Sequence, residues 1–598
     1  MKTLLIHNNN TSFNNLELFT LAEQFVFDVD FDKDVDLYIN ENLTNGGLMH
    51  KLEKCDIVFI KLSLSNNYLE FLGLRLAYHI RLTKSLGENA YLPIVLIAEE
   101  SFQYIGLTYS QPSILFTKGI YLINESFDDF NNIIRWFKED KLKTLDDFSA
   151  FVNSITINPP SNYLSHHSIA NEWSILRWAK VIGMSTNNGI LNELNTNIES
   201  LLYYKYLQAK YPIDKESNLE PLRIEGKGRI LYIDDEWNKG WSVFLEKFVL
   251  TSPGIELKTF EYEYNDKSQC EIILECQKKI QNYKPDVVLL DLRLAETDFS
   301  DRIKSNELTG YKILKMIKSL NPGIQVLIFT ASNKIWNLAE LQNAGCDNFL
   351  LKESPDLSVD NEYSKNSIKN LGSAITLAFK MSFLKKVYVK ISEIEALYTI
   401  SSNDEESEFI VRLRNNLNIA FKLLTESKYS VKYFNYSYLQ LFQIIEDFSK
   451  LSFVFREGSD CYVCVNGTDI CVSKTLKDEW ETAISFTDKY KIFPKLISLN
   501  DKRKRLDTNY IVSAILIFRL GYENSSALDW TNIYTIRNSK AAHFNVEDAL
   551  NEIEIYEILN FIKNFINPSK QKITNIQKGL KIKTFEESID FLKNRFKK

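Results

Sequence analysis

The stretch Arg229–Asp235, which reads RILYIDD, decides the fold of the middle of this chain. Its apolar run Ile230–Ile233 ends in two aspartates, and the later run Val287–Leu290 also ends in an aspartate, Asp291. Continuous apolar strands that alternate with helical patterns are typical of a parallel sheet covered on both faces. We therefore expect a doubly wound α/β domain here.

Two further apolar runs end in polar residues. Val326–Phe329 is followed by Thr330, and Phe349–Leu351 is followed by Lys352. Ligands of such sheets bind at the carboxyl ends of the strands, so these side chains should meet the three aspartates. Close carboxylates repel one another by about 3 kcal/mol per pair, and Mg²⁺ offsets that repulsion. A carboxylate nucleophile with an ammonium and a hydroxyl beside it suits phosphoryl transfer.

Residues 226–365 resemble the receiver domains of response regulators, and the resemblance implies that Asp291 is the phosphoacceptor. It implies a Mg²⁺ site made by four residues: Asp234, Asp235, Asp291 and, through its backbone carbonyl, Arg293. It also implies three residues that bind the phosphoryl group or switch with it: Thr330, Lys352 and Phe349. The sequence departs from the family pattern in a longer loop between Asp291 and Gly310, and in Glu353, which stands where proline is frequent.

Residues 1–140 repeat the same pattern without its chemistry. Asp56–Leu64 (DIVFIKLSL) aligns without gaps with Asp286–Leu294 (DVVLLDLRL), and Gly73 matches Gly310. The positions of the acid pair, the phosphoacceptor, the threonine and the lysine are taken by other residues: His7 and Asn8, Lys61, Glu99 and Asn124. We predict a pseudo-receiver used for oligomerisation or sensing. The alternative is an unrelated α/β domain.

Residues 141–225 are predicted to form a helical connector after Pro159 and Pro160. His166 and His167 begin one of its helical patterns. A phosphorelay role for them is one interpretation, but their flanking residues match no phosphotransfer motif, and polar residues at a helix start are the simpler reading. An amphipathic pattern over residues 366–404 predicts a linking helix.

Residues 405–567 are predicted to be mostly helical, with a β-hairpin turn at Asn466–Gly467. Cys461 and Cys464 lie three apart on one of its strands and should face opposite sides, which argues against a zinc site. The segment Arg537–His543 (RNSKAAH) lies between two helical patterns. His543 can act as a general acid or base at neutral pH.

This segment resembles the active motif of HEPN domains (higher eukaryotes and prokaryotes nucleotide-binding), many of which are metal-independent endoribonucleases that act as dimers. The resemblance implies three catalytic residues: Arg537, Asn538 and His543. RNA attraction would come from Lys502–Arg505 and from the tail 568–598, predicted to be a basic helical segment. The tail has 8 Lys and 1 Arg against 3 acids, a charge of 9 − 3 = +6 within a chain of net charge −7.

The 598 residues, 45% hydrophobic and 25% charged, predict several globular domains. A signal peptide and an apolar run of the ~18 residues that span a bilayer are both missing, so a cytoplasmic protein is expected. We expect a multidomain α/β and all-α response regulator, phosphorylated by a sensor histidine kinase or phosphotransfer protein, that controls an endoribonuclease. Its layout resembles effectors of bacterial antiphage two-component systems.

Two alternatives remain open at this point. The first is a regulator whose HEPN-like domain binds a protein or nucleotide partner without cutting RNA. The second is a receiver protein that buffers phosphoryl groups. The RNA target and the sign of the regulation are not indicated, and transcription control is not expected because no DNA-reading helix-turn-helix stands out.

Overall fold

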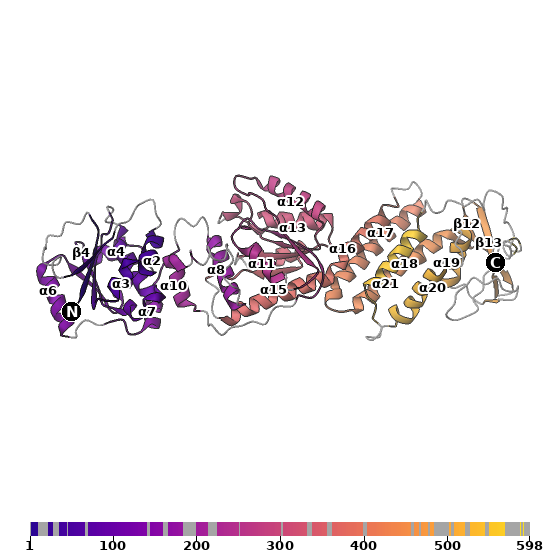
Figure 1. Ribbon diagram of the computed structural model, residues 1–598. Helices are drawn as coiled ribbons and strands as arrows, with labels where there is room; N and C mark the ends of the chain where they lie inside the picture. Colours follow the sequence, from indigo (N-terminus) through magenta and orange to yellow (C-terminus); the bar gives the residue numbers. More distant parts are fainter. Residues whose placement is uncertain are drawn as a thin grey trace.

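The protein is described by a computed structural model in which three bodies follow one another along the chain (Figure 1). The described residues are 2–9, 22–27, 35–44, 46–65, 70–139, 144–159, 166–182, 196, 199–212, 224–249, 252–300, 303–331, 338–355, 361–398, 404–455, 460–465, 468–476, 479–482, 502–503, 508–520, 527–543, 549–567, 587 and 590.

The first body is a parallel five-stranded sheet with the order β2-β1-β3-β4-β5. Its strands are β1 (Thr3–His7), β2 (Glu23–Val26), β3 (Ile57–Lys61), β4 (Ile94–Ala98) and β5 (Ile120–Asn124). Its main helices are α2 (Val35–Thr44), α3 (Gly47–Leu52), α4 (Leu72–Leu82), α5 (Phe102–Thr108) and α6 (Phe127–Lys138). Strands β1, β3 and β4 are buried along their whole length, as continuous apolar runs require.

The second body repeats this connectivity in a sheet of order β10-β9-β8-β6-β7. Its strands are β6 (Gly228–Ile233), β7 (Ile255–Thr259), β8 (Val287–Leu290), β9 (Gln325–Thr330) and β10 (Asn348–Leu351). Its helices are α11 (Trp241–Val249), α12 (Gln269–Tyr283), α13 (Thr309–Leu320), α14 (Leu338–Asn343) and α15 (Asn361–Met381). The prediction of two doubly wound, flavodoxin-like sheets is confirmed.

Two glycines at matching places show how closely the bodies repeat each other. A Cβ on Gly310, in the first turn of α13, would lie 2.2 Å from the carbonyl oxygen of Asp291. A Cβ on Gly73, in the first turn of α4, would lie 2.5 Å from the carbonyl oxygen of Lys61. In both bodies the helix therefore packs against the strand end so tightly that only glycine fits.

The connector is helical, as predicted, and consists of α7 (Phe148–Ser154), α8 (His166–Val181) and α10 (Leu202–Lys210). Its apolar residues belong to one continuous core that reaches from the first sheet to the second.

The third body is a helical bundle whose far end carries a small sheet (Figure 1). The bundle contains α16 (Phe383–Glu395), α17 (Asp404–Thr425), α18 (Lys432–Ser452), α19 (Thr508–Ala514), α20 (Ala527–Ile536) and α21 (Glu552–Phe565). The expected hairpin is part of a larger antiparallel sheet: β11 (Phe453–Phe455), β12 (Asp460–Val465), β13 (Thr468–Leu476), β14 (Glu479–Thr482) and β15 (Lys502–Arg503).

The expected single helix over residues 366–404 is divided in two at Ser382. The apolar residues of α15, such as Ile375, pack into the core of the second body. Those of α16, such as Val387, pack into the core of the helical bundle. Because the two halves of the pattern face different cores, the chain turns between them, and α15 is the last helix of the second body.

No helix within the described ranges is both long enough and apolar enough to cross a membrane. The predicted basic tail, 568–598, falls outside the described residues except for Glu587 and Asp590.

Candidate functional sites

The carboxyl ends of four neighbouring strands of the second sheet form one polar pocket. Asp234 and Asp235 follow β6, Asp291 follows β8, Thr330 ends β9 and Lys352 follows β10. The side chains of the first aspartate, of Asp291, of Thr330 and of Lys352 are fully buried, and Asp235 is half-buried. The structure therefore brings five of the predicted site residues together.

Lys352 offsets part of the negative charge of the pocket. Its Nζ lies 2.6 Å from Oδ2 of Asp234 and 3.1 Å from Oδ2 of Asp291. Burial alone lowers the pKa of this lysine, but the two carboxylates more than offset burial, so the pKa lies above its ordinary value. The ammonium also lies 5.3 Å from the ring centroid of Phe329. Lys352 is therefore a fixed positive charge beside Asp291.

Asp291 accepts hydrogen bonds on both carboxylate oxygens. Thr330 Oγ1 donates to Oδ1 over 2.7 Å, and Lys352 donates to Oδ2. The backbone N–H of Leu292 also donates to Oδ1. The backbone N–H of Arg293 donates to the same oxygen over 3.4 Å, so four donors hold the carboxylate in place and favour its charged form, which is the nucleophilic form.

The three aspartates also fit a divalent cation. One ligand oxygen from each of Asp234, Asp235 and Asp291 lies within 4.8 Å of the other two. An all-oxygen donor set of carboxylates suits Mg²⁺ better than a softer metal. Asp234 is oriented by Tyr232, whose hydroxyl donates to Oδ2 over 2.7 Å. The three predicted carboxylate ligands of Mg²⁺ are therefore close enough to one another to bind one ion.

The two remaining predicted residues flank the pocket. Arg293 is two residues beyond Asp291, and its guanidinium lies 5.8 Å from the ring centroid of Phe299. Phe349 lies on β10 and is half-buried. It lines a cavity of about 500 Å³ between β10 and α15, together with Tyr363 and Asn366. Phe349 also packs against the hydrophobic core of the second body.

The long loop after Asp291 is held by a buried acid that the sequence analysis did not single out. The carboxylate of Asp298 is fully buried and accepts hydrogen bonds from the backbone N–H groups of Leu294 (2.9 Å), Ala295 (3.0 Å) and Thr309 (3.2 Å). The amide of Gln269 on α12 also donates to it. This carboxylate therefore ties the first part of the loop to the start of α13.

At the corresponding strand ends of the first sheet, an ion pair has its acid and its base in exchanged positions. In the first sheet Ile60 of β3 pairs with Leu96 of β4, and in the second sheet Leu290 of β8 pairs with Ile328 of β9. The residues that follow Ile60 and Leu290, Lys61 and Asp291, therefore occupy equivalent positions. Lys61 Nζ lies 2.9 Å from the Glu125 carboxylate and 3.7 Å from that of Glu99. A lysine and a glutamate thus replace the aspartate and the lysine of the second body.

Strand pairing corrects two positions of the sequence alignment. Ile97 pairs with Ile123 in the first sheet, and Phe329 pairs with Leu350 in the second. Two residues after Ile123 and Leu350 stand Glu125 and Lys352, so the counterpart of Lys352 is Glu125 instead of Asn124. Thr330 corresponds to Ala98 instead of Glu99 by the same register. Each prediction was one residue off because the end of a strand is not visible in an apolar run.

The fold defines the class: the chain carries two doubly wound sheets of the receiver type, and only the second has the three acids, the threonine and the lysine at its strand ends. The family model of the inactive receiver domain matches residues 2–123, and the prediction of a pseudo-receiver there is confirmed. No curated protein matches the sequence.

Similar solved structures include a LuxR-family response regulator from an Aurantimonas species, with 19% identity over 25% of this chain and 86% of that one and a TM-score of 0.17. A receiver domain from Bacteroides fragilis has 22% identity over 24% of this chain and 97% of that one, with a TM-score of 0.17. A receiver domain of a diguanylate cyclase from Desulfovibrio desulfuricans G20 has 12% identity over 25% and 97%, with a TM-score of 0.15.

The third candidate set lies at the end of α20. Arg537 begins a π-helical turn, Arg537–Ala541, and its Nη1 donates to Asn538 Oδ1 over 2.8 Å. Its guanidinium lies 5.5 Å from the ring centroid of Phe442, and its Nε is buried with no hydrogen-bond partner among the described residues. His543 is exposed. The structure thus places the predicted Arg and Asn in contact and leaves the His accessible to a substrate.

A buried asparagine holds the loop that follows this turn. Asn435 on α18 is fully buried, and its Nδ2 donates to the carbonyl of Lys540 over 3.0 Å. Its Oδ1 accepts from the backbone N–H of Leu550 over 3.4 Å. One side chain therefore ties together both ends of the segment that carries His543, a role that no local sequence signal indicates.

Proposed function

We propose that this chain is a response regulator that accepts a phosphoryl group on Asp291 and thereby controls a C-terminal endoribonuclease site. The observation that carries the proposal is the arrangement around Asp291, where a buried carboxylate is held by Lys352 and Thr330 beside two further acids. Generic doubly wound domains do not need this combination of charges for stability.

The reaction that suits this pocket is phosphoryl transfer to a carboxylate. An oxygen of Asp291 attacks the phosphorus of the donor, the new O–P bond forms, and the bond to the leaving group breaks, so that the leaving group takes its electron pair. Lys352 and Thr330 already donate to Asp291 and are within reach of oxygens on a group bound to it. Mg²⁺, when held by the three aspartates, would neutralise charge on the phosphoryl oxygens.

The donor that we propose is a separate sensor histidine kinase or phosphotransfer protein. His166 and His167 begin α8, and their side chains lie outside what the structure describes. A small acyl phosphate, such as acetyl phosphate, has the same type of transferable group and serves as a laboratory donor.

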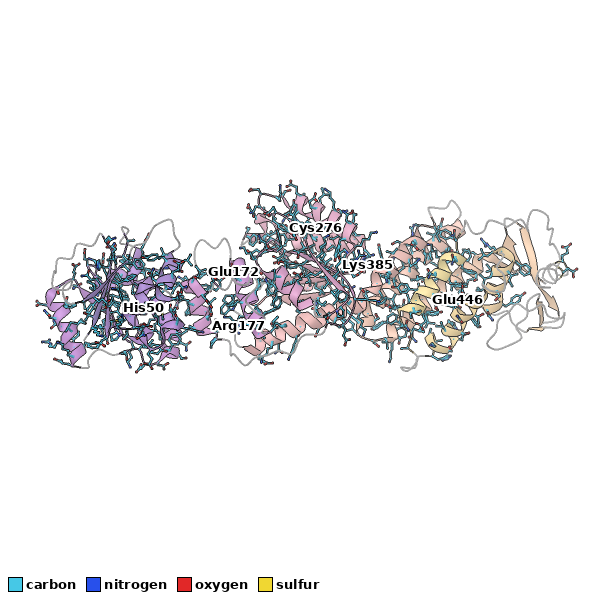
Figure 2. All side chains as sticks on the ribbon, in the orientation of Figure 1. His50, Glu172, Arg177, Cys276, Lys385 and Glu446 are labelled. Carbon is cyan, nitrogen blue, oxygen red and sulfur yellow. The ribbon has the colours of Figure 1, made fainter. Side chains whose placement is uncertain are left out.

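The path from the pocket to the bundle runs through α15. This helix packs against β9 and β10, and after Ser382 the chain continues into α16 of the bundle. Lys385, at the junction labelled in Figure 2, donates to Asp286 Oδ1 over 2.7 Å and so ties α16 to the residue before β8. A shift of Thr330 and Phe349 on phosphorylation would therefore act on the bundle through packed elements.

The output that we propose is cleavage of RNA by Arg537, Asn538 and His543. The RNA 2′-oxygen attacks the phosphorus while His543 takes its proton, and the bond to the 5′-oxygen breaks as that oxygen gains a proton. Arg537 would hold the phosphate through the positive charge of its guanidinium. We propose a homodimer in which two such sites line one cleft.

The test measures RNA degradation by wild type, Arg537→Ala, His543→Ala and Asp291→Ala, each with and without acetyl phosphate and Mg²⁺. His50→Ala is the matched control, because His50 is exposed on the first body. We expect His543→Ala and Arg537→Ala to abolish RNA cleavage. In Asp291→Ala, we expect the rate of RNA cleavage to be the same with and without the phosphodonor.

Three outcomes separate the alternatives. If wild type takes up no phosphoryl group, Asp291 is not a phosphoacceptor. If phosphorylated and unphosphorylated wild type both leave RNA as intact as His543→Ala does, the bundle is a non-catalytic binding domain. If, in addition, phosphorylation leaves the bundle unchanged by hydrogen exchange, the chain is a phosphate buffer. The antiphage role that we propose predicts that His543→Ala removes protection from phage in cells that carry the system.

A further inference from the structure

From Asn171 to Val181, helix α8 of the connector is buried almost all round between the two receiver-type domains. Its apolar residues join the continuous core, and three of its polar side chains are also fully buried: Asn171, Ser174 and Arg177. A helix that is buried on every side is part of a domain core and not a linker. The described part of α8 therefore belongs to the core that the two bodies share, where it can transmit a displacement.

On the side that faces the second body, α8 contacts three residues, each of which is next in sequence to a residue of the pocket. Asn171 Nδ2 donates over 2.5 Å to Glu236, which follows the acid pair. The ring of Trp178 lies 6.1 Å from that of Phe329, which precedes Thr330. The third contact is to Glu353, which follows Lys352.

The contact with Glu353 is the strongest of the three. Arg177 Nε lies 2.7 Å from Glu353 Oε1, and neither side chain has exposed surface. Trp178 Nε1 donates to Oε2 of the same carboxylate over 3.1 Å, and Ser364 on α15 donates to it over 2.7 Å. Ser174 donates to the backbone carbonyl of Glu353. The main chain next to Lys352 is therefore fixed by α8, which explains why glutamate stands where receivers often have proline.

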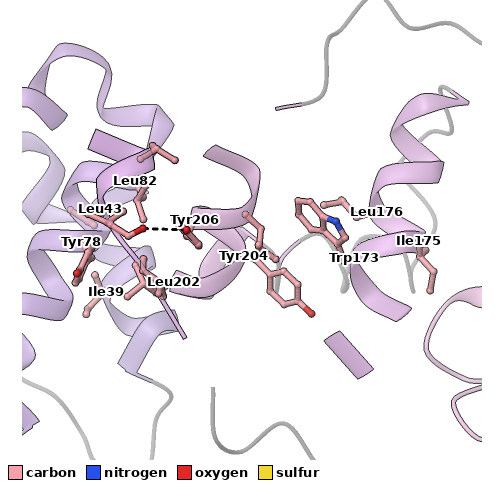
Figure 3. Close-up of a cluster of buried hydrophobic side chains, with 14 of the residues drawn as sticks. Ile39, Leu43, Tyr78, Leu82, Trp173, Ile175, Leu176, Leu202, Tyr204 and Tyr206 are labelled. Atoms are coloured by element: carbon pink, nitrogen blue, oxygen red, sulfur yellow. Dashed lines mark hydrogen bonds between the residues drawn. The ribbon is translucent and has the colours of Figure 1, made fainter. Parts of the chain in front are cut away.

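On the other side, α8 contacts α10. Tyr204 of α10 donates through its hydroxyl to Glu172 over 2.6 Å, and Arg177 Nη1 donates to the carbonyl of Tyr211 over 2.9 Å. Figure 3 shows Tyr204 on the side of α10 that faces Trp173, with Leu202 toward the first body. Figure 2 shows Glu172 and Arg177 between the two bodies.

Helix α10 is anchored in the first body by polar contacts. The backbone N–H of Leu202 donates to Asp36 Oδ2 over 2.9 Å, and Lys205 Nζ donates to Thr83 Oγ1 over 2.8 Å. Within the connector, Tyr206 donates to the carbonyl of Ile155, which follows α7, over 3.2 Å. A chain of direct contacts thus runs from the inactive receiver domain through α10 and α8 to the residue beside Lys352.

We propose that α8 couples the inactive receiver domain to the phosphorylation site, with the Arg177–Glu353 ion pair as the coupling contact. The pair holds Lys352 against Asp291 while α8 is docked, so phosphoryl transfer is fastest in the docked state. Coupling between two sites is reciprocal, so phosphorylation of Asp291 changes the docking of α10 on the first body. This inference rests on the proposed role of Asp291.

The experiment measures the rate at which full-length protein gains a phosphoryl group from acetyl phosphate with Mg²⁺, by intact mass. Tyr204→Phe removes the hydroxyl that reaches Glu172 and leaves the pocket untouched. Arg177→Met with Glu353→Met replaces the buried ion pair by apolar side chains, which buried pairs often tolerate without unfolding. We expect the rate to fall in both, by roughly fivefold or more in the double variant.

Lys318→Met is the matched control. It breaks a partly buried ion pair of the same domain, Lys318–Asp347 with a separation of 2.6 Å, and we expect it to leave the rate unchanged. Hydrogen exchange of α10 in wild type, with and without acetyl phosphate, is a second readout that needs no variant. We expect exchange to differ between the two states.

The outcomes distinguish this inference from the proposed function. If wild type is not phosphorylated, the phosphoacceptor assignment fails. If wild type is phosphorylated, but Tyr204→Phe and the double variant match it in rate and α10 exchanges identically in both states, the coupling is wrong. If the double variant does not fold, the phosphorylation rate of Tyr204→Phe and the hydrogen exchange of α10 in wild type decide whether the coupling exists.

Discussion

Lys61 and Glu125 form an ion pair, 2.9 Å apart, at the positions where Asp291 and Lys352 form one, 3.1 Å apart, with the charges exchanged. Each pair links the end of the third strand of its domain to the residue after the fifth strand. A buried charge without its partner is costly, so an inactive domain that loses the aspartate must also replace the lysine. The reversed pair preserves the packing of this edge and removes the nucleophile.

We predict that exchanging the reversed pair by Lys61→Asp with Glu125→Lys gives a folded protein whose first domain takes up no phosphoryl group. His7 and Asn8 stand where Asp234 and Asp235 supply acids, so restoring the nucleophile alone leaves the site without a cation-binding set. The measurement is intact mass after acetyl phosphate treatment, in an Asp291→Asn background. Phosphoryl uptake on residue 61 would show that the acid pair is not required.

We predict that the first domain loses stability as the pH falls from about 6.5 to about 4. Burial lowers the pKa of His79 from 6.5 to about 4, assisted by the positive charge of Lys205. Lys205 can only donate, and its Nζ lies 3.2 Å from His79 Nδ1, so Nδ1 accepts. The imidazole is therefore neutral and donates a hydrogen bond through its Nε2–H to Oδ1 of Asp36.

The unfolded chain binds a proton on this histidine below its ordinary pKa of 6.5, whereas the folded protein does so only near pH 4. Stability is therefore fully present above pH 6.5 and falls by about 3 kcal/mol as the pH drops to 4. Thermal unfolding of wild type and His79→Phe at several pH values tests this, and the variant should lose most of the slope. The exposed His50 gives the control, His50→Gln, which should keep the wild-type slope.

We predict that Gly310→Ala displaces the phosphoacceptor. The new Cβ would lie 2.2 Å from the carbonyl oxygen of Asp291, which is backbone and cannot rotate away. The variant should unfold at a lower temperature and react more slowly with acetyl phosphate.

Gly106→Ala is the matched control, because Gly106 lies inside α5 and nothing stands within 4 Å of a Cβ there. It should stabilise the protein by about 0.5–1 kcal/mol, since alanine is the better helix former. Equal effects of the two substitutions on the phosphorylation rate would contradict the assignment of the close contact.

We predict that Asn435→Leu weakens RNA cleavage without abolishing the fold of the bundle. The substitution leaves the carbonyl of Lys540 and the N–H of Leu550 without their buried partner, at a cost of about 1–3 kcal/mol in unfolding free energy. The loop with His543 would then sample more conformations. RNA cleavage and thermal unfolding should be measured together with Ser449→Ala, which removes a buried hydrogen bond elsewhere on α18 and should leave cleavage intact.

The parts of this protein that could be predicted from sequence are those with a local signal. Apolar runs ending in Asp234, Asp291, Thr330 and Lys352 identified both the strands and the pocket, because the carboxyl ends of parallel strands meet at one edge. The inner repeat was visible in the same way, and Gly73 and Gly310 marked equivalent close contacts.

What the local pattern could not determine depends on which distant surfaces meet. A long amphipathic stretch predicted one helix, whereas its halves bury their apolar faces in two cores and turn at Ser382. Glu353 looked like a minor departure from a family pattern until its partner, Arg177, was found on the connector. Periodicity and strand ends are properties of neighbours in the chain, so the amino-acid order encodes them directly. The pairing of two buried charges, one on α8 and one just after β10, is decided only when the domains pack, because desolvation makes each charge depend on the other.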